Sequence, residues 1–115
     1  MKVTLGVIQR AVVANILPKE GNITNMRLLR EFREMLSFTE EENKLYQPRY
    51  EVDGKSKQQM FIYRTVDDEG QLVPQEKEFE VGDVVAKLIE GELKELDKAG
   101  KLKDEHIDLY NTFVT

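Results

Sequence analysis

The chain of 115 residues has no cysteine, no tryptophan and a single histidine. Without cysteine it has no disulfide bond, no thiolate nucleophile and no cysteine-ligated zinc site, and a reducing compartment is favoured. No run approaches the roughly 20 continuous apolar residues that a membrane-spanning helix needs. Arg10 falls inside the apolar N-terminal stretch that could otherwise pass for a signal peptide. We therefore expect a cytoplasmic protein with no membrane partner.

Apolar residues make up 40% of the chain and charged residues 34%, which is typical of a globular protein. The length fits one domain, predicted over residues 1–115. Charge is unevenly spread: residues 1–38 carry six Lys/Arg against three Asp/Glu (+3), and residues 39–115 carry eleven against nineteen (−8). The acidic remainder disfavours broad phosphate binding, although it could face a basic partner.

The N-terminal third has helical spacing. Residues 4–17 place apolar side chains three and four apart, which predicts a helix, although their β-branched residues leave a strand open. Residues 24–37 carry a clear apolar stripe, with expected surface ion pairs Arg27–Glu31 and Arg30–Glu34. A short helix over 37–46 begins at two overlapping capping boxes, Ser37…Glu40 and Thr39…Glu42.

The middle of the chain has strand-like composition in three runs: residues 49–52, 58–66 and 77–81. Asp53-Gly54 and residues 67–71 are the expected turns, so the pattern predicts a three-stranded antiparallel meander. The last third predicts two helices, over 83–100 capped by Asp83 and over 104–114 capped by Asp104, with Gly100 between them. The prediction is an α+β domain with N-terminal helices, a small meander and a C-terminal αα-hairpin.

His106 lies in the expected first turn of the last helix, between Glu105 and Asp108. Residues one and two apart on a helix do not face each other, so neither acid is well placed to orient the imidazole. Triad-like chemistry would need a carboxylate and a nucleophile from elsewhere. A solvated or partly packed histidine is the favoured interpretation, and a pocket around it stays open.

The stretch from Thr65 to Glu76 partly fits a calcium-binding EF-hand loop when Gly70 is aligned on the loop's sixth residue. Asp67, Glu69 and Glu76 then take the third, fifth and twelfth positions. Thr65 stands where the first aspartate is expected, and the flanks resemble strands. A hairpin turn is therefore favoured over a metal site, and no cofactor is expected.

Arg27, Arg30 and Arg33 lie loosely on one side of the predicted helix over residues 24–37. They could contact phosphates, which gives a nucleic-acid-binding alternative. Glutamates are interleaved with them, and no aromatic residues accompany them as in common nucleic-acid readers. An exposed face with ion pairs is the favoured interpretation. No P-loop, GxGxxG, HExxH or CxxC motif occurs.

Two segments resemble a group of small uncharacterised proteins encoded in tailed-phage and prophage genomes of bacteria. They are "LPKEGNITNMRLLREFREMLSFTEEE" and "LIEGELKELDKAGKLKDEHIDLYNTFV", and together they cover about half of the chain at its two ends. The resemblance brings no activity and no binding residues. It implies a small phage-associated protein without catalysis.

These observations lead to one expected function and two alternatives. The first is a phage or prophage accessory protein that binds a host or phage protein, in assembly, in replication or as an inhibitor. The first alternative is nucleic-acid binding through the basic N-terminal third. The second alternative is a hydrolase-type enzyme that uses Asp/Glu with His106. Partly apolar strand faces leave room for a homodimer.

Overall fold

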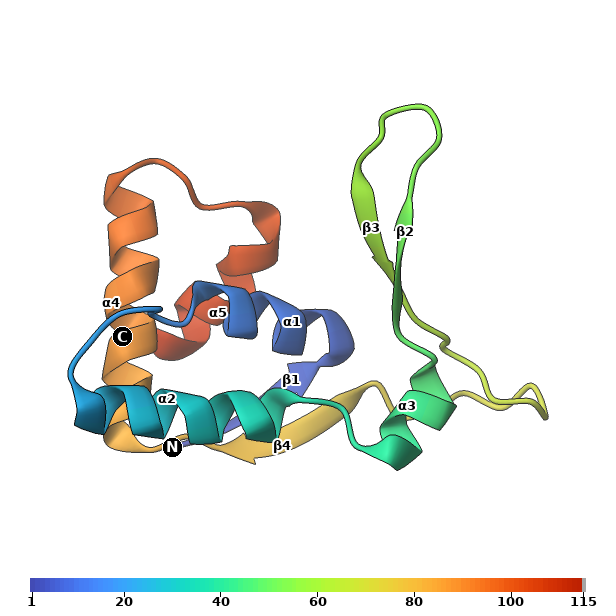
Figure 1. Cartoon of the computed structure of the whole chain (residues 1–115), viewed down its shortest axis with the longest axis horizontal. Coiled ribbons are helices and arrows are strands. Elements are labelled where there is room, and N and C mark those ends of the chain that lie inside the picture. The colour runs from blue at the N-terminus through green and yellow to red at the C-terminus, as the bar shows by residue number, and fades with distance from the viewer. Residues whose placement is uncertain (115) are drawn as a thin grey trace. The chain divides into compact units, whose positions relative to one another are not determined.

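A computed structural model describes residues 1–114, and it confirms the α+β class. Figure 1 follows the elements along the chain: β1 (Lys2–Gly6), α1 (Val7–Ile16), α2 (Ile23–Leu36), α3 (Glu40–Tyr46), β2 (Arg49–Val52), β3 (Gln59–Ile62), β4 (Glu76–Glu80), α4 (Asp83–Lys98) and α5 (Asp104–Phe113). They form two compact units, one of residues 1–37 with 76–114 and one of residues 38–75. That residues 1–115 act as one domain stays a prediction.

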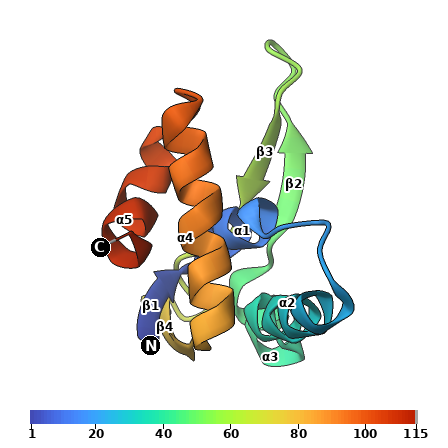
Figure 2. The same cartoon turned by 90° about the vertical axis from the view of Figure 1, so that its left-hand side faces the viewer.

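The first unit is built on a pair of strands far apart in sequence. β1 and β4 are antiparallel, with Val3 opposite Phe79 and Leu5 opposite Lys77. Val3, Leu5 and Phe79 are buried while Lys2 and Thr4 are exposed, so the pair turns one apolar face inward. α1, α2, α4 and α5 surround this face, and in Figure 2 α4 lies in front, with α5 on its left and α1 on its right.

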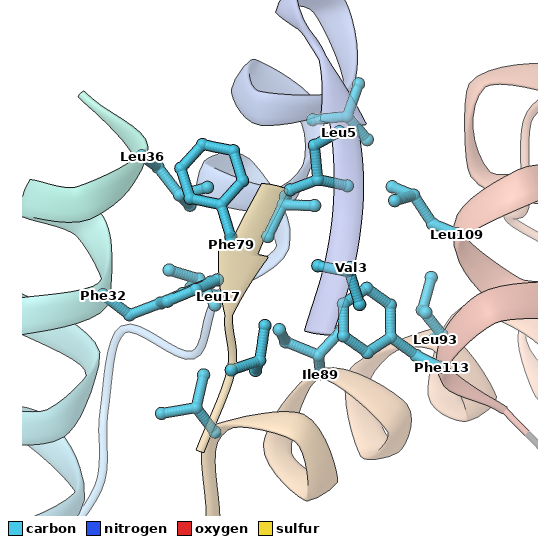
Figure 3. Close-up of a cluster of buried hydrophobic side chains, with 14 of the residues drawn as sticks. Val3, Leu5, Leu17, Phe32, Leu36, Phe79, Ile89, Leu93, Leu109 and Phe113 are labelled. Carbon is cyan, nitrogen blue, oxygen red and sulfur yellow. The ribbon is translucent and has the colours of Figure 1, made fainter. Parts of the chain in front are cut away.

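The core of the first unit gathers side chains from all six of its elements (Figure 3). α2 contributes Phe32 and Leu36 toward Phe79, and α4 contributes Ile89 and Leu93. α4 and α5 pack against each other as the predicted αα-hairpin, which is confirmed. Gly100, with a φ of +67°, ends α4 in the left-handed conformation that glycine adopts without strain.

The first element is both a strand and a helix, because residues 2–6 form β1 and residues 7–16 form α1. The predicted single helix over residues 4–17 is therefore wrong in its first turn. Val3, Leu5 and Val7 alternate with less buried residues, which is strand spacing, and the strand is completed only by its distant partner. As a result, Ile8, which lies within the predicted helix over residues 4–17, is exposed, whereas Val7 is buried.

The three-stranded meander is also wrong. Residues 76–80 pair with β1, so the chain has two two-stranded sheets, β1–β4 and β2–β3, among its described residues. Phe79 explains the choice, because pairing with β1 buries its ring against the helices. A third place beside β3 would have left it on an exposed hairpin.

The helix starts follow the sequence only in part. Thr39 caps α3 in the predicted box with Glu42, while Ser37 bonds instead to the carbonyl of Arg33. The predicted caps Asp83 and Asp104 are each the first residue of their helix, one position later than expected. Both remain in a first turn, where the helix dipole favours a carboxylate.

In the second unit, α3 is followed by the β2–β3 hairpin and a turned segment. β2 and β3 are antiparallel, with Tyr50 opposite Phe61 and Arg49 opposite Ile62. The hairpin loop covers Asp53 to Gln58 rather than a two-residue Asp-Gly turn, because the Asp53 N–H donates to the Gln58 carbonyl. No helix among residues 1–114 is long and apolar enough to cross a membrane.

Candidate interaction surface

One face of the β2–β3 hairpin is aromatic. Tyr50 and Phe61 lie opposite each other with ring centroids 5.3 Å apart, and Tyr63 follows Phe61 at 6.0 Å. Phe38 stacks on Phe61 at 6.5 Å, and it meets Tyr46 edge-on at 6.0 Å. Aromatic pairs of this kind stabilise a hairpin by about 0.5–1.5 kcal/mol each. The cluster therefore organises a hairpin in which no strand residue is buried.

The outer part of this face is open to solvent. Val52 is 67% exposed and Tyr50 59%, and both alternate with charged residues along β2. A large apolar side chain on an exposed strand is a feature of protein-binding surfaces, where tyrosine in particular gives contact area at little entropic cost. We define the aromatic face as Phe38, Tyr50, Val52, Phe61 and Tyr63.

Arg64 fixes the base of the hairpin to α3. Its guanidinium donates from Nε to the Leu45 carbonyl at 2.9 Å and from Nη2 to the Lys44 carbonyl at 3.0 Å. These carbonyls belong to the last turn of α3, where a cation is favoured by the helix dipole. The Tyr46 hydroxyl donates to the Pro74 carbonyl, which joins the end of the unit to the same helix.

Asp53 organises the hairpin loop through its carboxylate. The Lys55 N–H donates to it at 3.1 Å and the Ser56 hydroxyl at 2.9 Å, and these bonds lower the pKa of the Asp53 carboxyl below its ordinary value. A carboxyl with a depressed pKa in the folded loop stabilises the loop above its ordinary pKa of 3.8. That contribution is lost as the pH falls through the lower, folded value.

We expect Ser56→Ala to raise the pKa of Asp53 toward its ordinary value, because the hydroxyl that donates to the carboxylate is removed. An NMR titration of the Asp53 side chain measures this change. An unchanged Asp53 titration would contradict the loop geometry.

The turn at residues 67–71 is a hairpin turn, as the favoured interpretation predicts. Asp67 Oδ1 accepts the N–H groups of Glu69 and Gln71, and Gly70 takes a φ of +78°. Asp68 pairs with Arg64 at 2.6 Å. Of the EF-hand candidates, Asp67 and Glu69 lie in this turn, whereas Glu76 begins β4. No group of three or more metal-ligating side chains that could hold an ion occurs among residues 1–114.

His106 is buried at the start of α5, more deeply than the predicted solvated or partly packed side chain. The Lys103 N–H donates to its Nδ1 at 3.0 Å, so the imidazole caps its own helix. Nε2 lies 3.8 Å from a Glu105 carboxylate oxygen. The hydrogen bond and ion pair that the His106 imidazole forms within residues 1–114 thus come from Lys103 and Glu105, without an acid from another element.

Replacing His106 with alanine should lower the free energy of unfolding by about 2 kcal/mol, from the lost cap and the lost buried ring. Urea denaturation measures this change. Ile107→Ala, in the same turn but exposed, should change stability by less than about 0.5 kcal/mol. His106→Gln should recover part of the loss, since glutamine at this third helical position can accept the same N–H. Equal stability of wild type and His106→Ala would contradict the capping role.

The arginines of α2 differ in their surroundings. Arg27 and Arg30 are exposed, and the predicted pairs Arg27–Glu31 and Arg30–Glu34 do not form in the part of the chain that the structure describes. Arg33 donates from Nη2 to the Pro18 carbonyl at 3.1 Å. Arg27 and Arg30 are therefore exposed cations, whereas Arg33 bonds to the loop that precedes α2.

Arg10 is a structural residue that the sequence interpretation missed. It is only 2% exposed, and its guanidinium donates from Nε to the Leu36 carbonyl at 3.1 Å and from Nη2 to the Ser37 carbonyl at 2.9 Å. It also lies over the Phe79 ring at 5.2 Å. Helical spacing gives the only signal for it in the sequence, because Arg10 shares a face with Val7, Val13 and Ala14, of which the first two are buried.

Two surface depressions accompany these sites, one in each unit. The first is lined by residues 15–20 with Glu92 and Leu96, and the second by α3 residues with Arg64 and residues 67–69. Neither depression includes His106 among its lining residues.

The chain matches no protein-family model, and no match was found among curated proteins or among solved structures.

Proposed function

We propose that the chain is a small phage or prophage accessory protein that binds another protein through the aromatic face of its β2–β3 hairpin. The observation that carries this proposal is the exposure of Tyr50 and Val52 beside the organised rings of Phe61 and Tyr63. A binding protein needs such a face on a stable base, and the bonds of Arg64 to α3 supply the base.

The surroundings of His106 favour binding over catalysis. A hydrolase-type site would need His106 beside a carboxylate from another element and a nucleophile within reach. The imidazole instead uses Nδ1 as an acceptor for the backbone of its own helix. The proposed phage origin rests on the resemblance of the two terminal segments, and a cytoplasmic location in a bacterial host is part of the same proposal.

Affinity purification from prophage-carrying or phage-infected bacteria tests this proposal. We expect one partner to be recovered reproducibly with the wild-type chain and to be lost with the double variant Tyr50→Ser/Val52→Ser. Ile23→Ser is the matched control, because Ile23 is an apolar side chain of similar exposure, 65%, in the first unit. Recovery of no reproducible partner, or equal loss with the control, would contradict the proposal.

Nucleic-acid binding is the second candidate, favoured by the exposed guanidinium groups of Arg27 and Arg30. It predicts binding that weakens steeply as salt rises. Arg30→Glu should weaken it further, whereas Glu31→Gln on the same helix should not. An electrophoretic shift assay at low salt decides this candidate, and no shift with wild-type protein would reject it.

A further inference from the structure

The β2–β3 sheet has two outer edges, because each strand has only the other as its neighbouring strand among residues 1–114. A two-stranded hairpin is marginally stable alone in water and gains from further strands. All four residues of β2 are exposed. An exposed edge strand with a solvated apolar face is a template for strand addition.

The register shows which backbone groups face outward. The Asp53 N–H donates to the Gln58 carbonyl, so Asp53–Gln58 is a hydrogen-bonded pair. Hydrogen-bonded pairs alternate along an antiparallel ladder, which makes Glu51–Met60 and Arg49–Ile62 the next ones. The N–H and C=O groups of Tyr50 and Val52 therefore point to the free edge of β2.

The edge of β3 is less open. Its outward groups are those of the residues that alternate with Met60 and Ile62, and beyond the strand this series continues through Tyr63 to Thr65. The Thr65 carbonyl already accepts the Val73 N–H at 3.0 Å, and Val66 pairs with Leu72 in a bridge. The later segment of the same chain that contains Leu72 and Val73 thus occupies one end of the β3 edge. The β2 edge has no such neighbour among the described residues.

We infer that β2 pairs antiparallel with β2 of a second copy of the chain, about a twofold axis at Tyr50, to form a four-stranded sheet. In this register the two Tyr50 residues exchange N–H···O=C bonds. The Val52 N–H of each copy donates to the Pro48 carbonyl of the other. Pro48, which has no N–H, ends the pairing there.

Only in this register do the charged residues of β2 lie opposite residues of opposite charge in β2 of the second copy. With the twofold axis at Tyr50, the residue before Tyr50 in one copy lies opposite the residue after Tyr50 in the other copy. Arg49 of each copy therefore lies opposite Glu51 of the other, which gives two such pairs per dimer. Opposite charges in this position stabilise a strand pair. Within one chain Arg49 already bonds to Glu51, at 2.7 Å, on the same face of the strand. A shift by two residues would instead set Glu51 against Glu51, which is destabilising.

The dimer also joins the two aromatic faces. Tyr50 of each copy lies at the centre, with Phe61 of each copy one strand further out. The strands are short, and the interface is expected to bury less than the roughly 1,200–2,000 Å² of a stable complex. A reversible, concentration-dependent dimer is therefore expected rather than a permanent one.

Sedimentation of the purified full chain from about 1 µM to about 1 mM tests this inference. The expected result for the wild type is a mass that rises from monomer to dimer with concentration. Arg49→Glu and Glu51→Arg each set like charges opposite each other twice, and each should raise the dissociation constant at least about tenfold. The double variant Arg49→Glu/Glu51→Arg restores opposite charges and should restore the dimer.

Lys55→Glu is the matched control, since it reverses the same charge on the exposed hairpin loop, outside the proposed strand pair. It should dimerise like the wild type. A wild-type chain that stays monomeric at all concentrations would overturn the inference. A dimer that survives both single reversals, or one that the double variant fails to restore, would also overturn it.

The inference goes beyond the proposed function and can fail separately from it. Sedimentation uses only the purified chain, whereas the partner proposal needs a second protein from the cell. A dimer without a partner would support this inference alone. A partner bound by a strictly monomeric chain would support the proposed function and overturn this inference.

Discussion

Arg10→Met is expected to lower the free energy of unfolding by about 3 kcal/mol, one of the two largest effects in the chain. Methionine retains much of the apolar stem but cannot donate to the carbonyls of Leu36 and Ser37. Those carbonyls end α2, and at least the first would be left buried without this donor. The contact of the guanidinium with the Phe79 ring would be lost as well. Chemical denaturation monitored by circular dichroism measures the change.

Arg27→Met is the control for this prediction, because Arg27 is exposed on α2 and its guanidinium forms no hydrogen bond or ion pair within residues 1–114. It should alter stability by less than about 0.5 kcal/mol. The free energy of unfolding of Arg10→Lys should fall between those of the wild type and Arg10→Met. The lysine ammonium group can donate to one of the two carbonyls, but it cannot reproduce the planar, two-bond geometry of the guanidinium. Equal stability of Arg10→Met and wild type would show that Arg10 does not hold the end of α2.

Phe79→Ala should cost about 4 kcal/mol of unfolding free energy, within the range for truncating a buried aromatic ring. Phe79 is 3% exposed, pairs with Val3 across the β1–β4 sheet and packs with Leu36 of α2 (Figure 3). Its loss therefore opens a cavity where the strand pair meets the helices. Denaturation under the same conditions as for Arg10→Met gives the value.

Glu78→Ala, the neighbouring exposed residue of β4, controls for changes in strand propensity and should be nearly neutral. The double variant Arg10→Met/Phe79→Ala should lose less than the two single losses combined, because each single change already removes the contact between guanidinium and ring. A loss below about 1 kcal/mol for Phe79→Ala would contradict its place in the core.

Local patterns in the sequence predict the helical part of the fold well. The apolar stripe of α2, the Thr39 capping box and the αα-hairpin around Gly100 all depend on residues within a few positions of one another. The β1–β4 pair is different, because it joins residues 2–6 to residues 76–80. Short strands with few alternating residues carry too weak a local signal to reveal a partner so far along the chain.

The candidate surface could be predicted only in part. The turn at residues 67–71 and the strands of the hairpin follow from glycine, aspartate and aromatic residues in sequence. The roles of Arg10 and Arg64 could not be predicted, since each binds carbonyls about 20 or more residues away. A backbone carbonyl has no sequence signature, so an arginine that caps a distant helix looks like any surface arginine.

Photo-crosslinking from position 52 tests the central claim, that the hairpin binds another protein, most directly. A photoreactive residue is placed there, and at the exposed position 107 of α5 as control, in chains produced in bacteria that carry the phage or prophage. We predict a crosslinked species that contains a protein other than a second copy of the chain, formed from position 52 but not 107, and lost with Tyr50→Ser. The absence of any such protein crosslinked from position 52, or the same species from both positions, would contradict the account.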